Sequence, residues 1–501
     1  VTKELAEAKE LQLDHLDCTG TLPLSGYFKV STELMISEPC NITADRRGAR
    51  LFLEVPLHFK DSVEFHGNLS VIAVRQPLGG PCVRVEKDFV VTPGAELRFV
   101  NCRNPPKTLY GYGDGTEVAG QGGAMEVYGN LFIHGDLHIR NCSAGRGGAI
   151  YVENTFTQSD GTVTIKNSSA DEYGGAIFAQ KFVQSDGTLT IKNSSAKSSG
   201  GAIFAQRFAQ SDGTVKIENS SAKRDGGAIY VGDAFTQSDG TLTIKNSSAK
   251  SRGGAIYVEN TFTQSDGTVK IENSSAKRDG GAIYVENTFT QPDGMLTIAN
   301  SLARKNGGAI FANIFVQSDG TLTIENSSAE QHGGAIYVGD AFAQSDGTLT
   351  IANSLAKLTG GAMFIWKDFA LNRGNLSIRD ATAKIGGGMQ VNGDLVLVDA
   401  ALSFHQCHAL EDAGGIRAYG NVDASNTTLL FVRSTTDHGH GAALMAKDFK
   451  QHGGEMVILN NSAGQEIISV ANWTADGAVR LEHCISSTFL MSVHNASLTG
   501  V

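Results

Sequence analysis

The sequence predicts an all-β fold, a right-handed parallel β-helix in which the chain winds as a solenoid. A Gly-Gly pair returns every 26 or 27 residues from Gly147 to Gly386. Each repeat contains three short apolar runs of strand length, separated by clusters of Asn, Ser, Asp and Gly that favour turns. A fixed period of this size indicates one repeat per coil. We therefore expect about seventeen coils of about 26–27 residues, each with three short strands that pair with the next coil.

Two positions of each repeat stay apolar and are expected to point into the bore of the solenoid. One is the phenylalanine of Phe-Thr-Gln, as at Phe262, and the other is the isoleucine of Gly-Gly-Ala-Ile, as at Ile256. Stacked in successive coils, such residues fill the interior as a packed core. The bore is therefore predicted to be core and not a channel.

Composition narrows the classes of function and partner. The chain has 501 residues with 59 glycines and a net charge of −11, which argues against a general affinity for nucleic acid or anionic membranes. No run of about eighteen apolar residues occurs, so no membrane span is predicted. Five of the seven cysteines lie at or before Cys142. Any disulfides are therefore expected to cross-link the N-terminal part of the chain, where the repeat is irregular. Cys407 and Cys484 are expected to lie roughly 14 Å apart, too far to bridge, so at least one thiol stays free.

The domain organisation follows from where the repeat is clear and where it blurs. Residues 1–17 are rich in helix formers and are predicted to form an amphipathic helix that caps the first coil. Residues 18–121 are interpreted as irregular coils with one long surface loop at 103–121. Regular coils follow at 122–366, and degenerate coils at 367–501.

An aromatic residue follows the isoleucine in each clean repeat and forms the most informative column. Arg84, Glu126, Gln390 and Arg417 occupy the same position in flanking coils, and this tolerance of charge predicts that the column faces solvent. Two interpretations stay open: the rings stack to stabilise adjacent coils, or they form an exposed docking face for another protein chain or a glycan. The column consists of Tyr151, Phe178, Phe204, Tyr230, Tyr257, Tyr284, Phe311, Tyr337 and Phe364.

Two polar columns have simpler interpretations. Paired threonines such as Thr162 and Thr164 resemble the ice-binding face of certain antifreeze proteins, but Lys216 and Lys270 interrupt one row. Exposed threonine is also ordinary in strands. The Asp-Gly pair of each clean repeat is predicted to form a turn, and no calcium-binding pattern accompanies it.

Asparagine in the Asn-Ser-Ser motif recurs in the clean repeats and satisfies the N-glycosylation pattern. Asn300 and Asn353 keep the asparagine but lose the pattern, which predicts that this asparagine forms a buried amide ladder instead. Glycans are expected on the acceptor asparagines outside the clean repeats. These candidate sites are Asn41, Asn68, Asn141, Asn375, Asn426, Asn460, Asn472 and Asn495.

No catalytic residue, cofactor site or metal site is predicted. A polysaccharide-cleaving β-helix needs several acidic and basic residues on one face, whereas here the charges vary from coil to coil without a cluster. His405, His408, His438 and His440 lie near Cys407, but their spacing fits no metal-ligand pattern. They are interpreted as surface histidines.

Gly-Gly-Ala-Ile-Tyr combined with Asn-Ser-Ser-Ala, over about 122–463, resembles the repeats of chlamydial polymorphic membrane proteins and of related surface β-helices of algae and protists. The family's Phe-x-x-Asn motif is replaced here by Ile-Lys-Asn. In the bacterial family the repeats are displayed outside the cell and act in adhesion. The resemblance implies a β-helix at the cell surface.

Together these observations predict a non-enzymatic extracellular glycoprotein with a structural or adhesive role. Its expected partners are other protein chains or surface glycans, with self-assembly into a filament or surface layer, and its aromatic column is the expected contact face. A pectate-lyase-like enzyme is the alternative, and an ice-binding protein is the third. Near-identical coils favour a scaffold, because a catalytic site requires one coil to differ locally.

Overall fold

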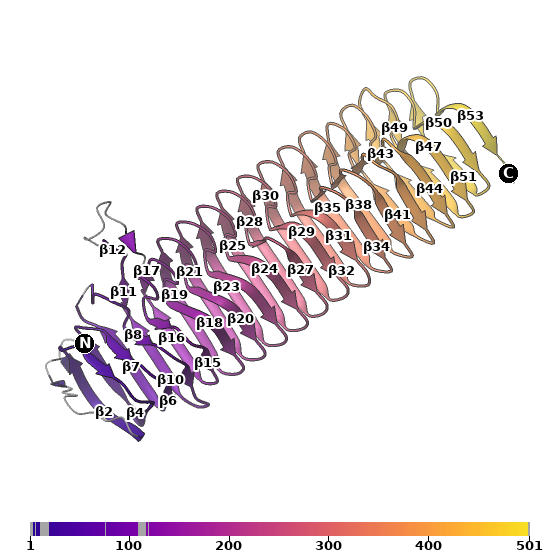
Figure 1. The fold of residues 1–501 in the computed structure, drawn as a ribbon. Coiled ribbons are helices and arrows are strands. Elements are labelled where there is room, and N and C mark those ends of the chain that lie inside the picture. The colour runs from indigo at the N-terminus through magenta and orange to yellow at the C-terminus, as the bar shows by residue number, and fades with distance from the viewer. Residues whose placement is uncertain are drawn as a thin grey trace. The chain divides into compact units, whose positions relative to one another are not determined.

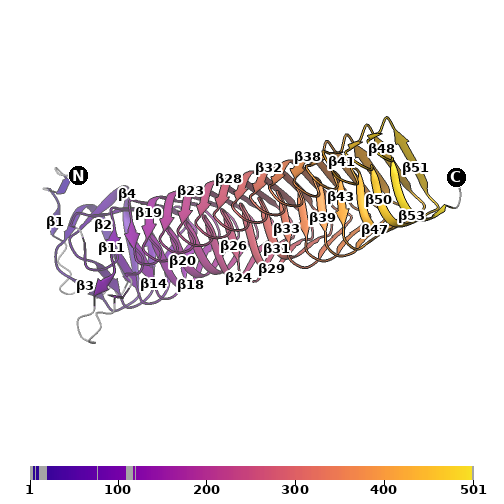
Figure 2. The same ribbon diagram turned by 90° about the horizontal axis from the view of Figure 1, so that it is seen from above.

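The computed structural model describes residues 4–5, 7–10, 20–75, 77–108, 117–118 and 120–498. Within these residues the fold is an all-β parallel solenoid of about seventeen turns, and no α-helix is among its elements. The chain divides into two compact units, residues 1–249 and residues 250–501. Figures 1 and 2 show the strands of successive turns lying side by side within each unit. The parallel solenoid expected from the repeat is confirmed.

Unit 1 begins with irregular turns and ends with regular ones. The irregular turns contain β1 (Lys9–Glu10), β2 (Gly20–Val30), β3 (Leu34–Ile36), β4 (Cys40–Leu53), β5 (Leu57–Phe59), β6 (Val63–His66), β7 (Asn68–Ala73), β8 (Val83–Val85), β9 (Phe89–Val91), β10 (Glu96–Val100), β11 (Arg103–Asn104), β12 (Lys107–Thr108), β13 (Glu117–Val118), β14 (Met125–Val127), β15 (Leu131–Ile133), β16 (Asp136–Arg140) and β17 (Ser143–Ala144). The regular turns contain β18 (Ile150–Gln158), β19 (Thr162–Ala170), β20 (Ile177–Gln184), β21 (Thr188–Ala196), β22 (Ile203–Gln210), β23 (Thr214–Ala222), β24 (Ile229–Gln237) and β25 (Thr241–Ala249).

Unit 2 runs in the opposite order, from regular turns to degenerate ones. The regular turns contain β26 (Ile256–Val258), β27 (Thr261–Gln264), β28 (Thr268–Ala276), β29 (Ile283–Gln291), β30 (Met295–Ala303), β31 (Ile310–Gln317), β32 (Thr321–Ala329), β33 (Ile336–Val338), β34 (Phe342–Ser345), β35 (Thr348–Ala356) and β36 (Met363–Ile365). The degenerate turns contain β37 (Phe369–Asn372), β38 (Asn375–Ala383), β39 (Met389–Val391), β40 (Leu395–Val398), β41 (Ala401–His405), β42 (His408–Ala409), β43 (Ile416–Ala418), β44 (Asn421–Ser425), β45 (Thr428–Val432), β46 (Thr435–Thr436), β47 (Leu444–His452), β48 (Glu455–Leu459), β49 (Ser462–Ala463), β50 (Ile468–Ala475), β51 (Ala478–Glu482), β52 (Ile485–Ser486) and β53 (Met491–Leu498).

The number of strands in a turn differs from the expected three. Most regular turns contain two long strands, such as β18 and β19 with nine residues each. The two apolar runs predicted as separate strands are joined in β18, which bends where its register against β20 shifts between Val152 and Thr155. The backbone thus keeps strand geometry around a corner. The turn formed by β26, β27 and β28 does contain three strands.

Two kinds of corner explain the repeated asparagine and glycine. Asn273 has a φ of 55°, a left-handed conformation that asparagine tolerates better than most residues. Gly280 has a φ of 64°. A Cβ atom on the next residue, Gly281, would lie 2.0 Å from the carbonyl oxygen of Gly308 in the following turn. The Gly-Gly pair is therefore required both for the bend and for the close approach of successive turns.

The core lies where the apolar columns predict it. Phe262 and Ile256 have no exposed surface, and the same holds within 1 % for the equivalent residues of the other clean repeats. The strands pair in exact repeat register, so that Ile283 lies beside Ile310 and Phe289 beside Phe315. Phe262 and Phe289 stack with their ring centroids 4.8 Å apart. The interpretation of the bore as packed core is confirmed.

The predicted helical cap at 1–17 is not confirmed. Lys9–Glu10 forms a β-strand that pairs in parallel with Phe28 and Lys29 of β2. The open edge of β2 offers unpaired backbone groups, and a strand satisfies them where a helix would not. Positions 1–3, 6 and 11–17 lie outside the described residues.

The predicted surface loop at 103–121 is only partly covered by the structure, because positions 109–116 and 119 lie outside the described residues. The described residues at its two ends form short strands. β11 pairs with β17 as part of the solenoid, and β12 pairs with β13 in an antiparallel ladder.

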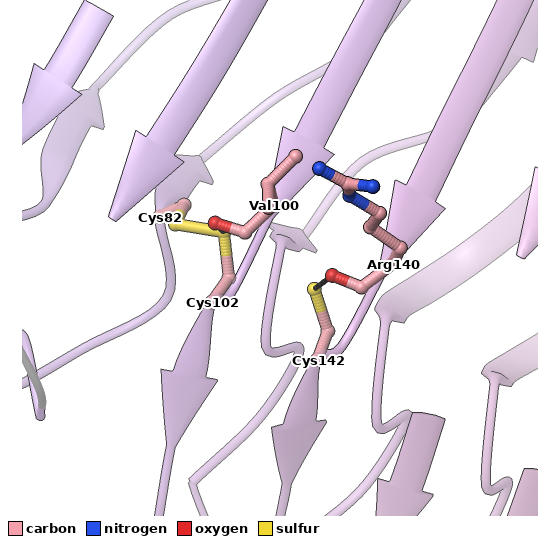
Figure 3. Close-up of a disulfide and its surroundings, with 5 residues drawn as sticks. All are labelled: Cys82, Val100, Cys102, Arg140 and Cys142. Atoms are coloured by element: carbon pink, nitrogen blue, oxygen red, sulfur yellow. Dashed lines mark hydrogen bonds between the residues drawn. A yellow bond between two sulfur atoms is a disulfide. The ribbon is translucent and has the colours of Figure 1, made fainter. Parts of the chain in front are cut away.

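The cysteines follow the predicted division between the irregular and regular parts. Cys82 and Cys102 form a disulfide, and Cys40 is also disulfide-bonded. Cys142, Cys407 and Cys484 are free. Figure 3 shows that the Cys142 thiol is directed to the backbone carbonyl of Arg140, with its sulfur 3.4 Å from the oxygen, and away from the neighbouring disulfide.

The three free thiols should differ sharply in reactivity. Burial raises the pKa of Cys142 and of Cys407 to about 12, whereas Cys484 is partly exposed. With pKa values this high, both buried thiols are almost fully protonated at about pH 8. They should react slowly, because the thiolate is the reactive form. We expect native protein treated with iodoacetamide to gain one label, at Cys484, and denatured protein to gain three. Rapid native labelling of Cys142 or Cys407 in peptide mass spectrometry would contradict this assignment.

Candidate functional site: the ladders between turns

The aromatic column forms a stacked ladder in each unit. In unit 1 the ring centroids of Tyr151, Phe178, Phe204 and Tyr230 are 4.9, 5.0 and 4.7 Å apart in succession. In unit 2 those of Tyr257, Tyr284, Phe311, Tyr337 and Phe364 are 5.1, 4.7, 4.8 and 5.2 Å apart. The ring planes of all these pairs are parallel to within 13°. Ring stacking between turns, one of the two interpretations left open by the sequence, is confirmed.

The expectation that this column is exposed is wrong for most of its members. Six of the nine rings are buried, with exposed fractions between 2 and 8 %: Tyr151, Phe178, Phe204, Tyr257, Tyr284 and Phe364. Only Tyr230, Phe311 and Tyr337 are half-buried. A contact role for the column stays a prediction, and these three rings are the ones that offer an edge to a partner.

For some of these rings the burial is explained by the side chain that directly precedes a Gly-Gly pair. Arg252 lies over the ring of Tyr284 at 5.1 Å, and His332 packs on Phe364 at 5.0 Å. The loop side chains therefore cover rings that point away from the core. Burial raises the pKa of Tyr284 to about 12.

Glu126 shows why tolerance of charge did not imply exposure. It shares the column with Arg84 and Tyr151 and is only 2 % exposed. Two nitrogens of Arg84 lie 2.8 Å from one carboxylate oxygen, and the Tyr128 hydroxyl donates to the other at 3.2 Å. Burial raises the pKa of Glu126 despite these partners. A charge is thus accommodated in a buried position because Arg84 on the neighbouring strand and Tyr128, two residues further along the chain, both bind it.

The repeated asparagines form a second ladder, which is hydrogen-bonded as predicted but is exposed and not buried. In unit 1 each side chain amide donates to the carbonyl oxygen of the preceding asparagine, as from Asn193 to Asn167 at 3.0 Å. Unit 2 repeats this from Asn300 to Asn273 at 3.0 Å. The left-handed backbone at each asparagine directs the amide outward at the corner, where the next turn offers a partner.

The candidate glycosylation sites outside the clean repeats fall into two environments. Asn375, Asn426, Asn460 and Asn472 are exposed, and Asn41 and Asn68 are half-buried. The Asn472 amide donates to Asp448 at 2.6 Å. Asn141 belongs to the ladder instead, since its amide donates to Asn101 and it accepts from Asn167. Asn495 lies in β53, and its side chain is outside the described residues.

Glycan occupancy should follow this division if the chain is secreted. A glycan on a ladder asparagine would use the nitrogen that donates to the preceding turn, and glycans on successive turns would be only about 4.8 Å apart. We expect little occupancy from Asn141 to Asn326 and substantial occupancy at Asn375, Asn426 and Asn460. Intact-glycopeptide mass spectrometry measures this. Full occupancy at consecutive ladder positions would contradict the prediction.

A third ladder, of buried glutamines, was not predicted from the sequence. The glutamine of Phe-x-Gln is at most 2 % exposed in all eight clean repeats: Gln158, Gln184, Gln210, Gln237, Gln264, Gln291, Gln317 and Gln344. The Gln210 amide donates to Gln184 at 3.1 Å, to the Gly213 carbonyl at 3.3 Å and to the Thr241 carbonyl at 3.2 Å. The sequence did contain a sign of this ladder, because the glutamine recurs in every clean repeat two residues after the inward phenylalanine and should therefore lie on the same side of the strand.

The two remaining polar columns are the Asp-Gly pairs and the paired threonines, and the structure confirms the turn predicted for the Asp-Gly pairs. The Asp-Gly pair forms a turn in which the aspartate side chain accepts from the following glycine, as at Asp266 and Gly267 at 2.6 Å. Thr162 and Thr164 are half-buried.

The histidine group does not converge on one point. His408 lies 2.9 Å from the Thr435 hydroxyl, and His440 contacts Glu466. Across the described ranges no three His, Cys, Asp or Glu side chains are placed to hold a metal ion.

The structure thus defines a parallel β-solenoid whose turns are joined by aromatic, asparagine and glutamine ladders. Comparison with protein-family models, with curated proteins and with solved structures finds no match to this chain. The resemblance to chlamydial polymorphic membrane proteins stays a prediction. No helix in the described part of the chain is long and apolar enough to cross a membrane.

Proposed function

We propose that this chain is a non-enzymatic structural or adhesive element of the cell exterior, which presents repeated lateral surfaces to other protein chains or to glycans. The observation that carries the proposal is the repetition of the same ladders in turn after turn. Backbone pairing, ring stacking and hydrogen bonds between side-chain amides all run along the solenoid axis, so each turn stabilises the next. Such a scaffold holds surface groups at a constant spacing of about 4.8 Å.

The disulfide between Cys82 and Cys102 supports the exterior location. Structural disulfides persist in secreted and extracellular proteins and are rare in reducing compartments. The proposal takes the winding as right-handed, the sense that parallel crossover connections nearly always have. It also takes the N-terminal turn to be capped, as exposed solenoid ends usually are.

One local departure from the repeat favours the alternative, a polysaccharide-acting enzyme. Arg84, Glu126 and Tyr128 form a hydrogen-bonded cluster, and His58 lies 2.6 Å from Glu86 beside it. Both oxygens of the Glu126 carboxylate are already bound within the protein, which suits a structural pair better than a general acid or base. Ice binding rests only on the half-buried threonine rows.

Antibody labelling of the source cells, intact and permeabilised, tests the proposed location. We expect equal labelling in both, with a cytoplasmic marker labelled only after permeabilisation. Labelling that requires permeabilisation would contradict the proposal. Release of new reducing ends from a polyuronate by the purified chain, and its loss in Glu126→Gln, would favour the enzyme instead.

A further inference from the structure

Unit 1 carries a hollow on the outer face of the sheet formed by β4, β7, β10, β16 and β19. Its volume is about 380 Å³, and five of its lining residues are cationic or histidine: Arg50, Arg98, His138, Arg140 and Lys166. The remaining lining residues come from the same strands and are aliphatic, aromatic or hydroxyl-bearing. None of the described residues that line it is acidic. This is unusual in a chain with a net charge of −11.

The strand register places these charges close together. Arg98 lies beside His138 on adjacent strands, and Arg140 lies beside Lys166. Adjacent strands are about 4.8 Å apart, so the two pairs form a compact positive patch. The patch ends at the next turns, where Lys192 is neutralised by Glu218 at 2.8 Å.

The charges in the hollow are incompletely compensated. Arg140 and Lys166 are exposed, and within the described part of the chain neither forms an ion pair. Arg98 pairs with Glu96 and Arg50 with Glu4, and His138 lies 3.4 Å from the same Glu96 carboxylate, yet the side chains of the two arginines remain 54 and 41 % exposed. Arg140 and Lys166 lie side by side without an acidic partner among the described residues, and a bound anion would relieve the repulsion between them.

Two further hollows continue this surface. One, of about 540 Å³, shares Arg50, Ser70 and Arg98 with the first, and it adds Tyr27 and Asn68 together with the acidic Asp45 and Glu96. The other, of about 450 Å³, is lined by Asn101, Arg103, Asn141, Ser143, Asn167 and Ser169. Asn101, Asn141 and Asn167 directly follow residues that line the first hollow. The first hollow and the one around Asn141 therefore offer a surface of cations, amides and hydroxyls, whereas the hollow around Tyr27 also carries two carboxylates.

We propose that this surface, here called the cationic hollow and defined by Arg50, Arg98, His138, Arg140 and Lys166, binds an anionic polysaccharide. Arginine and lysine bind carboxylate or sulfate groups through charge-assisted hydrogen bonds. The flanking amides and hydroxyls match the hydroxyl groups of a sugar chain. Single-stranded nucleic acid is normally bound on several stacked aromatic side chains, whereas the tyrosine and phenylalanine that line the three hollows are Tyr27, which is half-buried, and Phe99, which is buried.

The inference deepens the proposed function by naming one class of partner, and its biological setting rests on that function. It does not depend on the aromatic ladder. The binding experiment uses the purified full chain, so the cationic hollow can fail this test while surface labelling succeeds, and the reverse also holds.

Calorimetric titration with three probes tests the cationic hollow. The probes are a heparin oligosaccharide for sulfate, an oligogalacturonate for carboxylate, and poly-glutamate for an acidic protein segment. We expect at least one glycan to bind, more tightly than poly-glutamate, with an affinity that falls as salt is added. The glycan that binds more tightly identifies the anionic group.

A matched pair of triple variants locates the site. Arg98→Gln, Arg140→Gln and Lys166→Gln together should weaken glycan binding on the order of tenfold or more, since several charge-assisted contacts are lost. The control, Lys181→Gln, Arg207→Gln and Lys223→Gln, removes the same charge from exposed positions of unit 1 outside the hollow and should leave binding within about twofold. Amide exchange of the wild-type chain should slow in β16 and β19 when glycan is present, which requires no variant.

Three results would overturn the proposal. The first is that neither glycan binds at low salt. The second is that both triple variants weaken binding equally, which would indicate attraction without a site. The third is that poly-glutamate binds at least as tightly as either glycan, which would assign the hollow to an acidic protein segment.

Discussion

Replacing Phe262 by alanine is expected to destabilise unit 2 by about 3–5 kcal/mol. The ring has no exposed surface and stacks on Phe289 at 4.8 Å, so its removal leaves a cavity that the paired strands on either side cannot close. Because each turn of a solenoid contacts mainly its neighbours, the loss should be local. Chemical unfolding gives the size of the effect, and amide exchange should show it confined to β27, β29 and the strands beside them.

Thr263→Ala is the matched control, since Thr263 is the next residue on the same strand and is half-buried. It should cost less than about 0.5 kcal/mol. Equal losses for Phe262→Ala and Thr263→Ala would mean that the two faces of the strand have been assigned wrongly.

The sequence alone predicts that Tyr257→Gln costs less than about 1.5 kcal/mol, as an outward and exposed ring. In the structure Tyr257 is 5 % exposed, stacks on Tyr284 at 5.1 Å and donates to Glu286 at 2.9 Å. The loss of a stacked ring and a hydrogen bond raises the expected cost to about 1.5–3 kcal/mol. The loss of stability caused by Tyr257→Gln should therefore be larger than that of Thr263→Ala and smaller than that of Phe262→Ala.

Gln210→Leu tests the second large effect, the hydrogen bonds of the glutamine ladder. Leucine fills a similar volume but removes the amide that donates to the Gln184 side-chain oxygen at 3.1 Å and the oxygen that accepts from the Gln237 amide at 3.2 Å. The Gly213 carbonyl keeps its bond from the Thr241 backbone N–H. Each buried polar group left unpaired costs roughly 1–3 kcal/mol. We expect a loss of about 3 kcal/mol in chemical unfolding, with faster amide exchange in β22 and β24.

Gln206→Leu provides the control, because Gln206 lies on the same strand and is exposed. It should change stability by less than about 0.5 kcal/mol. Gln210→Ala should cost more than Gln210→Leu, because it adds a cavity to the lost bonds. If Gln210→Leu is neutral, the ladder contributes packing alone and its hydrogen bonds do not stabilise the native state.

The fold could be predicted because it depends on periodicity. A strict interval between Gly-Gly pairs, with apolar residues at constant positions such as Phe262 and Ile256, leaves one arrangement in which all those residues are buried together. The glycine requirement has the same local origin, a left-handed corner at Gly280 and a close carbonyl contact at Gly281. Likewise, the clustering of cysteines in the first part of the chain was sufficient to place the disulfides there.

What the sequence could not decide is the environment of residues that point away from the core. Charge at Glu126 indicated exposure, but Arg84 on the neighbouring strand, with Tyr128, satisfies that charge in a buried position. Asn193 was expected to be buried and is exposed, although its ladder bond was anticipated. In each case the partner is supplied by another turn or by a covering loop, and side-chain type at one position does not reveal it.

The cationic hollow depends most strongly on tertiary structure. Arg50, Arg98 and Arg140 are separated by about 40–50 residues along a part of the chain where the repeat is irregular, so no periodic signal links them. Parallel pairing of β4, β7, β10 and β16 brings them to one face. The sequence by itself thus determined the solenoid and its core, because apolar residues at a constant period can be buried together in only one way. Only the tertiary structure decided the surface, because exposure and charge compensation there depend on which side chains the neighbouring turns provide.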